Sequence, residues 1–290
     1  MKKIIILIPI YNDWESLSKL LNDINQEIEN INNFEFNCII VNDNSTIEKS
    51  NFSKPRNIKT LKIINMKNNK GHARCNAFGL RYINLNENFD YVIVMDGDGE
   101  DRPQEIKDLT DKIKEDTEKS VVAKRIKRSE GVIFQLMYKG HKLITLLTTG
   151  KKIDFGNYSC LTKKDVVILS DKASLWSSFS GSLKKYISNY NEISSIRGRR
   201  YFGPSKMSLF NLFLHSFSII AVFKYSVLLR SAIFLSLLFF FKAKFLIFSS
   251  SLQLLIILFC ILIFLVSLRE NRKELLNSQE NLKDIEDILH

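Results

Sequence analysis

The sequence of 290 residues predicts an α/β domain with a mostly parallel sheet, followed by a helical segment attached to a membrane. Two observations predict the domain: short apolar runs alternate with amphipathic helical patterns, and polar clusters follow the apolar runs. A third predicts the membrane segment, because residues 209–268 consist mainly of Leu, Ile, Phe and Ser. With 45% hydrophobic residues, the chain can build one large core and an appendage.

The elements of the domain follow one another in a regular order. Apolar runs predict strands at residues 4–10, 36–41, 61–64, 91–95 and 120–123. A helix with an apolar face is expected to begin at Asn12 or Asp13, and others at 71–82 and 103–114. Strands separated by helices predict a sheet with right-handed crossovers, in which the polar clusters gather at the carboxyl ends of the strands.

The most informative cluster follows the strand at 91–95. It contains four acids, which are Asp96, Asp98, Glu100 and Asp101. Four acids at one strand end repel one another unless a cation lies among them, and an Asp-x-Asp pair can offer oxygens to Mg²⁺ or Mn²⁺. The alternative is a solvated acidic turn that caps the helix beginning near Pro103.

Several classes of function are disfavoured. Residues 8–13 lack the Gly-x-Gly-x-x-Gly fingerprint of dinucleotide-binding domains, and no phosphate-binding P-loop motif occurs. The four cysteines are widely spaced and form no Cys-x-x-Cys pair, which fits a reducing compartment. The net charge of +11 fits anionic lipids or phosphorylated substrates better than nucleic acid, because no nucleic-acid-binding motif accompanies it.

The membrane segment lies near the C-terminus. Residues 245–268 contain no charged residue and are long enough to cross a bilayer core of about 30 Å. Residues 225–241 are a weaker span, because Arg230 interrupts them, so a two-helix hairpin is favoured over one span with an interfacial helix. Before it, the pattern of residues 209–220 fits a helix in the membrane interface or an ordinary core helix.

These patterns divide the chain into four parts. We expect a catalytic domain at 1–206, an amphipathic juxtamembrane helix at 207–224, two transmembrane helices at 225–268 and a charged tail at 269–290. The N-terminal apolar stretch ends at Pro9 and reads as a strand rather than a signal peptide. The domain and the tail are therefore expected on the cytoplasmic side of the inner membrane, and the protein is expected to be multi-pass.

Six short motifs stand in one order along the chain. They are 8–13 (Ile-Pro-Ile-Tyr-Asn-Asp), 41–46 (Val-Asn-Asp-Asn-Ser-Thr), 69–74 (Asn-Lys-Gly-His-Ala-Arg), 95–98 (Met-Asp-Gly-Asp), Arg125 with Arg128, and 203–206 (Gly-Pro-Ser-Lys). In this order the chain resembles the family 2 glycosyltransferases of GT-A fold, and among them the polyprenyl-phosphate and dolichol-phosphate sugar transferases with C-terminal membrane helices. The likeness of the motifs covers roughly residues 1–210, and the expected hairpin extends it toward 268.

The resemblance implies a site for a nucleotide diphosphate sugar. Its nucleotide-sugar-binding residues would be Pro9, Tyr11, Asp13, Asp43, Arg74, Asp96, Gly97 and Lys206. Asp43 and Arg74 would lie near the base, and Gly97 would allow close backbone approach. Asp96 and Asp98 would hold Mg²⁺ or Mn²⁺ on the diphosphate, with Asp98 as the direct ligand.

The resemblance also implies residues for catalysis and for the acceptor. Arg125 and Arg128 could make forked contacts with phosphate, or could form a solvated basic loop. Arg200 belongs to a second basic group, which could bind phosphate or anionic headgroups. Glu100 and Asp101 are the nearest candidates for a general base.

The acceptor stretch departs from the pattern of relatives that use lipid phosphate. Those relatives often have Gly-Asp-Phe-Arg where this chain has Gly-Asn157-Tyr-Ser159. His72 and His141 are interpreted as packing or surface residues.

Three hypotheses follow. The first is an inverting, metal-dependent transferase that moves a sugar to polyprenyl phosphate, which is ionised near neutral pH and requires little or no general base. The second keeps the donor and uses a hydroxyl on a lipid-linked or envelope glycan. The third is a non-catalytic membrane protein that keeps a nucleotide-binding fold as a scaffold. Membrane lipids are expected partners, and copies of the chain could assemble through the membrane helices.

Overall fold

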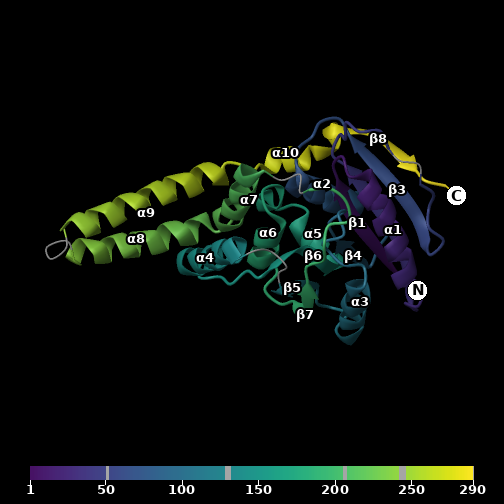
Figure 1. The fold of residues 1–290 in the computed structure, drawn as a ribbon, viewed down its shortest axis with the longest axis horizontal. Coiled ribbons are helices and arrows are strands. Elements are labelled where there is room, and N and C mark those ends of the chain that lie inside the picture. The colour runs from purple at the N-terminus through teal and green to yellow at the C-terminus, as the bar shows by residue number, and fades with distance from the viewer. Residues whose placement is uncertain (50–51, 128–131, 205–207, 242–245, 290) are drawn as a thin grey trace.

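The structure, a computed structural model, describes residues 1–49, 52–127, 132–204, 208–241 and 246–289 (Figure 1). Within these ranges an eight-stranded mixed sheet has the order β7-β5-β6-β4-β1-β2-β3-β8. The strands are β1 (Lys2–Ile10), β2 (Phe34–Asn42), β3 (Ile58–Met66), β4 (Tyr91–Val94), β5 (Val121–Lys127), β6 (Phe155–Thr162), β7 (Asn191–Ile196) and β8 (Leu282–Asp287). The expected α/β class is confirmed.

The centre of the sheet is parallel. Strands β4, β1, β2 and β3 run side by side in one direction, as their apolar sequences predict. β5 pairs in parallel with β7, whereas β6 is antiparallel to both β4 and β5. The sheet is therefore mostly parallel with antiparallel strands inserted, and β2 and β3 are longer than expected at both ends.

Helices cover both faces of the sheet. α1 (Trp14–Ile28) and α3 (Glu105–Glu115) pack on one face, where alternate residues of β1 such as Ile4 and Ile6 are fully buried. α2 (His72–Asn86), α5 (Lys163–Leu169) and α6 (Phe179–Tyr186) pack on the other face. A short 3-10 helix, η1 (Ala173–Trp176), joins this second layer. The helices hold the strands so that the carboxyl ends of the parallel strands β1, β2, β3 and β4 meet at one edge.

A pair of long helices extends from the domain. α8 (Lys224–Phe241) and α9 (Leu246–Ser267) lie against each other, and α7 (Leu209–Ala221) and α4 (Val132–Thr149) lie where the pair meets the domain (Figure 1). Among the described residues, one helix, Ile247–Leu276, is long and apolar enough to cross a membrane. Residues 210–221 and 224–240 meet that test only as a pair bent by 83°. The sequence predicts two complete membrane spans, and the structure gives weaker support, with one such helix and one bent pair in the described ranges.

The C-terminal residues return to the domain, which their charged sequence did not predict. α10 (Arg272–Leu276) and the 3-10 helix η2 (Ser278–Asn281) lead into β8, which pairs antiparallel with β3. Asn65 of β3 donates to Asp284 at 2.6 Å and to Glu286 at 2.7 Å, and Leu275 is fully buried in the core. Both ends of the α8–α9 pair are therefore fastened to the same domain.

Candidate active site

The loops that follow β1, β2 and β4 share one edge of the sheet, because these strands are parallel neighbours. Hydrogen bonds tie the first two loops together: the Asn12 backbone N–H donates to Ser45 Oγ at 2.8 Å, and the Thr46 N–H donates to Asn12 Oδ1 at 2.7 Å. The third loop contains the four acids Asp96, Asp98, Glu100 and Asp101, and we call it the acidic loop. Gly97 lets this loop lie directly on β1, since a Cβ there would approach Ile10 Cγ2 to 2.9 Å and the Pro9 carbonyl oxygen to 3.3 Å.

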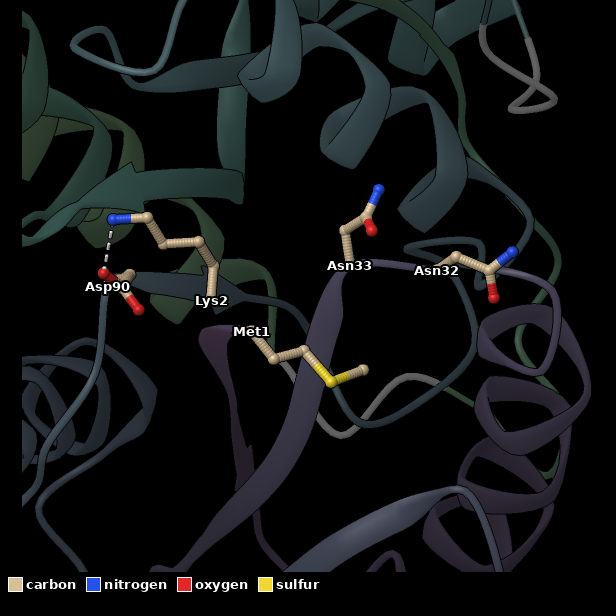
Figure 2. Close-up of a pocket in the computed structure, with 5 residues that line it drawn as sticks. All are labelled: Met1, Lys2, Asn32, Asn33 and Asp90. Carbon is tan, nitrogen blue, oxygen red and sulfur yellow. Dashed lines mark hydrogen bonds and ion pairs between the residues drawn. The ribbon is translucent and has the colours of Figure 1, made fainter.

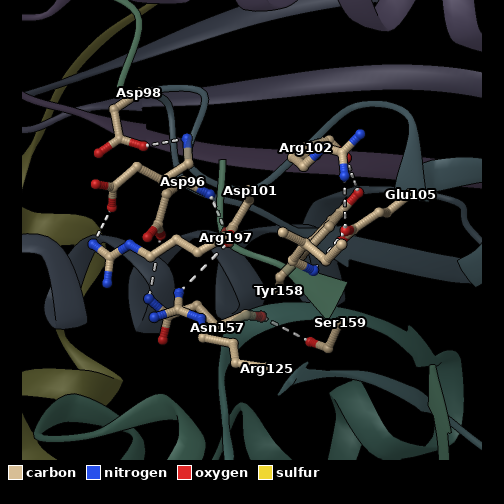
Figure 3. A network of polar contacts seen from close by, with 12 residues as sticks. Asp96, Asp98, Asp101, Arg102, Glu105, Arg125, Asn157, Tyr158, Ser159 and Arg197 are labelled. Atoms are coloured by element: carbon tan, nitrogen blue, oxygen red, sulfur yellow. Dashed lines mark hydrogen bonds and ion pairs between the residues drawn. The ribbon is translucent and has the colours of Figure 1, made fainter. Parts of the chain in front are cut away.

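The acids of the third loop occupy different environments (Figure 3). Asp101 is buried, and its carboxylate accepts the Asp96 backbone N–H at 2.9 Å. Asp98 Oδ1 accepts the Glu100 N–H at 3.0 Å, and the Asp98 side chain is 17% exposed. Glu100 forms an ion pair with Arg197. Asp101 thus supports the loop from within, whereas Asp98 is partly exposed.

The charged groups in and around this loop shift one another's pKa values. Burial, together with the neighbouring Asp96 and Glu100 carboxylates, raises the pKa of Asp98 to about 6. Burial and the Asp96 carboxylate raise the pKa of Asp101 to about 8, although Arg125 opposes the shift. Burial would also raise the pKa of Asp96, but the neighbouring His72 and Arg125 charges and the His72 and Asn157 hydrogen bonds hold it below its ordinary value. The loop therefore carries negative charge that a bound cation would stabilise.

Arg200 supplies a positive charge at the site. Its guanidinium donates to Asp98 Oδ2 at 2.7 Å through Nη1 and to Asp13 Oδ2 through Nη2. The three side chains are 15–17% exposed, so the contacts are largely shielded from water. Arg200 therefore bridges an acid that follows β1 and an acid that follows β4.

The segment around Arg200 lies directly across the acidic loop. The Tyr201 N–H donates to the Asp98 carbonyl at 3.0 Å, and the Gly198 N–H donates to the Glu100 carbonyl at 2.8 Å. Gly99 adopts a φ of +86°, and a Cβ at this position would come within 2.5 Å of the Tyr201 ring. Residues 197–203 therefore cover the acidic loop.

A second group of residues borders Asp96. Asn157 Nδ2 lies 3.3 Å from Asp96 Oδ1 and 2.7 Å from His72 Nε2. His72 Nε2 also lies 3.2 Å from Asp96 Oδ1, and although burial opposes it, the Asp96 charge raises the pKa of His72. Arg125 of β5 lies nearby, with Nη2 3.6 Å from Asp101 Oδ1. Side chains from α2 and β6 thus contact Asp96, and Arg125 of β5 contacts the neighbouring Asp101.

The carboxylates of the acidic loop suit a divalent ion whose coordination shell is completed by oxygens of the substrate. Among the residues that the structure describes, no group of three or more His, Cys, Asp or Glu side chains is arranged to hold a metal by itself. Mg²⁺ and Mn²⁺ do not require such a group when a diphosphate supplies the remaining ligands. The Asp98 and Asp96 carboxylates, with side chains 17% and 23% exposed, fit that role.

The residues expected near the nucleotide base have other contacts. Asp43 is buried and accepts the backbone N–H groups of Lys70 at 2.8 Å and Gly71 at 2.7 Å. Arg74 donates to the Lys70 carbonyl at 3.0 Å and lies over the Trp176 ring. Asp43 therefore shapes the loop before α2, and these contacts of Arg74 direct it toward Lys70 and Trp176 rather than toward the acidic loop. Tyr11, which directly follows β1 at the same edge of the sheet, is 39% exposed.

Three expected residues remain, Ser159, Arg128 and Lys206, and the structure adds two residues that were not expected at the site. Ser159 is buried and its hydroxyl donates to the Asn157 carbonyl at 2.9 Å, so it supports β6 rather than the acidic loop. Arg128 and Lys206 lie outside the described residues. His72, interpreted from the sequence as a packing or surface residue, lies instead at the site, as does Arg197. The sequence feature that could have placed His72 at the site is its position shortly after β3, at the carboxyl edge of the sheet.

The pocket in Figure 2 lies at the other end of the sheet. It is lined by Met1, Lys2, Asn32, Asn33 and Asp90, which precede or begin strands β1, β2 and β4. Lys2 and Asp90 form an ion pair of 2.9 Å there. A nine-residue strand, about 30 Å at 3.3 Å per residue, separates this end of β1 from the acidic loop.

Comparison with known proteins finds solved structures of similar fold. The glucosyl-3-phosphoglycerate synthase of Mycobacterium tuberculosis, solved with Mn²⁺, UDP-glucose and phosphoglyceric acid, is 12% identical, with a TM-score of 0.51 over 78% of this chain and 80% of that chain. The mannosyltransferase PcManGT of Pyrobaculum calidifontis, solved with GDP-Man and Mn²⁺, is 11% identical, with a TM-score of 0.48 over 91% and 86% of the two chains. TarS 1–349 of S. aureus is 14% identical, with a TM-score of 0.46 over 79% and 68%. No curated protein matches the sequence.

The mixed α/β sheet, with acids at the end of β4, defines a fold of the GT-A glycosyltransferase type. The profile of glycosyl transferase family 2 matches residues 5–174, which is more than half of the chain. The chain belongs to glycosyl transferase family 2.

Proposed function

We propose that this protein transfers a sugar from a nucleoside diphosphate sugar to polyprenyl phosphate at a membrane surface, with inversion at the anomeric carbon. The observation that carries the proposal is the contact of Arg200 with Asp98 and Asp13 at the carboxyl edge of the sheet, with Asp96 in the same loop as Asp98. Carboxylates suit a divalent ion, and guanidinium groups suit the phosphate oxygens that accompany it.

The reaction exchanges two bonds at the anomeric carbon. The bond to the diphosphate oxygen breaks, the leaving nucleoside diphosphate keeps the electron pair, and an acceptor oxygen bonds from the opposite face. A divalent ion held by Asp98 and Asp96 would supply charge neutralisation for the leaving group. Arg125, 3.6 Å from Asp101, and Arg200 can donate to phosphate oxygens from two sides of the loop.

The phosphate acceptor is supported by the chemistry of the acids. An ionised lipid phosphate attacks without a general base. Asp101 is poorly placed to act as a base, because it is buried at 4% exposure and its carboxylate already accepts the Asp96 N–H. Glu100 is paired with Arg197. Neither carboxylate is needed when the acceptor is a phosphate.

Membrane attachment is supported by the helices beyond the domain. α9 carries a long run of exposed apolar residues, including Leu254, Leu255 and Leu258 at 53–62% exposure. Because β8 returns the chain to the sheet beside β3, an α8–α9 hairpin that crosses a bilayer would begin and end on one side. We propose that this is the cytoplasmic side of the inner membrane, with two crossings.

Transfer assays with the full-length protein in anionic nanodiscs test the function. A panel of UDP- and GDP-sugars is incubated with polyprenyl phosphate, with Mn²⁺, with Mg²⁺ or with a chelator. We expect metal-dependent transfer that Asp98→Asn abolishes and that Asp108→Asn, on the exposed face of α3, leaves intact. Absence of both transfer and donor hydrolysis across the panel, with an intact fold, would refute the proposal.

A second candidate keeps the donor and replaces lipid phosphate with a hydroxyl on a lipid-linked or envelope glycan. It is favoured by Asn157 and Ser159, which stand where an acid and an arginine are common in relatives that use lipid phosphate. This candidate requires a base, and Glu100, with 21% of its side chain exposed, is the accessible acid. Loss of transfer in Glu100→Gln, with unchanged donor binding, would support it over the first proposal.

A further inference from the structure

Between residues 139 and 149, helix α4 has its polar and apolar faces inverted. In the described part of its side chains, Thr145 and Thr149 are buried at 2–3% exposure. Leu143, Ile144, Leu146 and Leu147 are 44–56% exposed. A helix on a water-exposed surface normally buries its leucines and exposes its threonines. The outward face of α4 is therefore suited to an apolar environment rather than to water.

The buried threonines do not require a partner outside the helix. Thr145 Oγ1 donates to the His141 carbonyl at 2.8 Å, and Thr149 Oγ1 donates to the Thr145 carbonyl at 2.6 Å. Their hydroxyls are thus satisfied within the helix, and the small side chains allow α4 to lie close to its neighbours. The inversion is a stable arrangement and leaves no buried hydroxyl of these two residues unpaired.

The exposed face of α4 is continuous with the apolar helices. α4 packs beside α8 and α7 (Figure 1), and His141 Nε2 lies 3.1 Å from the Ser216 carbonyl of α7. Arg230 of α8 directs its guanidinium to the C-terminal end of α4, where Nη1 lies 3.5 Å from the Leu147 carbonyl. A Cβ at Gly150 would meet Arg230 Nη2 at 2.4 Å, so the close approach depends on glycine. The charge that interrupts α8 is thus placed at a helix C-terminus, where it is favourable.

Lysines lie at both ends of the apolar face. Lys139 precedes it, and Lys151 and Lys152 follow it, and all three are exposed. Apolar side chains between lysines are typical of a helix that lies in the headgroup region of an anionic bilayer. A surface for a second protein copy would not require this arrangement of cations.

We propose that residues 139–152 form a second membrane-docking surface, on which α4 lies in the interface of an anionic bilayer beside α8. The inference rests on the proposed membrane attachment of α8–α9, and it does not depend on the sugar, the metal or the acceptor. Two separated contacts with the bilayer would fix the orientation of the domain, as a single hairpin alone would not. The carboxyl edge of the sheet, which bears the acidic loop, would then face the bilayer at a constant angle.

Fluorescent labelling of the full-length protein tests this surface. Leu146→Cys is labelled with an environment-sensitive fluorophore in a Cys260→Ser background, because the other three cysteines are buried. Lys107→Cys on α3 is the water-exposed control, and Leu258→Cys on α9 is the control within the apolar helix. The proteins are reconstituted in vesicles of phosphatidylcholine with or without phosphatidylglycerol, and thermal unfolding confirms the fold of each variant.

In vesicles with phosphatidylglycerol, we expect the label at 146 to emit at shorter wavelength than the label at 107. Lipids with a headgroup-level nitroxide should quench it, consistent with a depth of about 5–10 Å. Lys151→Glu with Lys152→Glu should reduce this quenching while leaving that at 258 unchanged. Water-like emission at 146 overturns the proposal. So does a blue shift that lipid nitroxides do not quench and that disappears on dilution of the protein among vesicles, which identifies a second copy as the partner.

Discussion

Replacing Arg200 tests the electrostatic reasoning about the site most directly. The guanidinium neutralises Asp98 and Asp13 in the metal-free protein, and a divalent ion that binds Asp98 competes with it for the same carboxylate. We therefore expect Arg200→Gln to bind Mn²⁺ more tightly than the wild-type protein in the absence of nucleotide.

The size of the effect follows from the contact that the ion must weaken. Arg200 and Asp98 are 15% and 17% exposed, and they form a hydrogen bond of 2.7 Å between charged groups. Hydrogen bonds of this kind contribute about 1.5–3 kcal/mol, which corresponds to roughly 10- to 150-fold in affinity. Because the pair is partly solvated, the lower end of this range, about tenfold, is the expected gain.

Isothermal titration of Mn²⁺ into the purified protein measures this change. Arg102→Gln is the matched control, because Arg102 lies beside the same loop and its nearest acid is Glu105, at 3.9 Å. With UDP present, the advantage of Arg200→Gln should shrink, since Arg200 is then free to donate to the diphosphate. Unchanged or weaker Mn²⁺ affinity in Arg200→Gln, with the control unaffected, would refute the competition between the arginine and the ion.

Three further predictions concern metal binding, pH and the tail. Asp98→Asn should abolish Mn²⁺-dependent nucleotide binding in calorimetry while the variant stays folded at the assay temperature, and a retained metal response would contradict the assignment of the ligand. Because the folded pKa of Asp101 is raised from 3.8 to about 8, its contribution to stability falls as the pH rises through that window. Asp101→Asn should thus melt at a higher temperature than wild type at pH 8, with little difference near pH 4; an advantage that did not depend on pH would oppose this cause. Leu275→Ala should cost about 2–5 kcal/mol of unfolding free energy because Leu275 is fully buried, whereas Leu289→Ala, 78% exposed, should cost little. Equal costs in denaturant titration would show that the tail does not pack on the domain.

The arrangement of the strands was predictable because its signal is local. Apolar runs such as residues 4–10 and 91–95 identified buried strands, and the polar residues after them identified one edge of the sheet. Asp96 and Asp98 could be placed together with Asp13 on that basis alone. β6 and its antiparallel direction were not predicted, because residues 155–162 mix polar and apolar side chains without an apolar run, and local sequence does not show the direction of a strand.

The C-terminal strand was missed for a related reason. Residues 282–287 (Leu-Lys-Asp-Ile-Glu-Asp) carry four charged side chains and two apolar ones at the edge of the sheet, and a short charged segment of this kind resembles a solvated tail. Its pairing with β3 depends on partners such as Asn65, more than 200 residues earlier in the chain. The inverted face of α4 was equally hidden, because periodicity identifies an apolar face without showing whether it points to the core or away from it.

The sequence by itself determined the fold class, the family and the loop that carries the acids. Each of these follows from the residue types within short windows and from the order of those windows. The tertiary structure decided how the acids are used: Asp101 supports the loop, His72 borders Asp96, and Arg200 bridges Asp13 and Asp98. These contacts join residues up to 187 positions apart, and the crossovers of the sheet, rather than any local pattern, bring them within hydrogen-bonding distance.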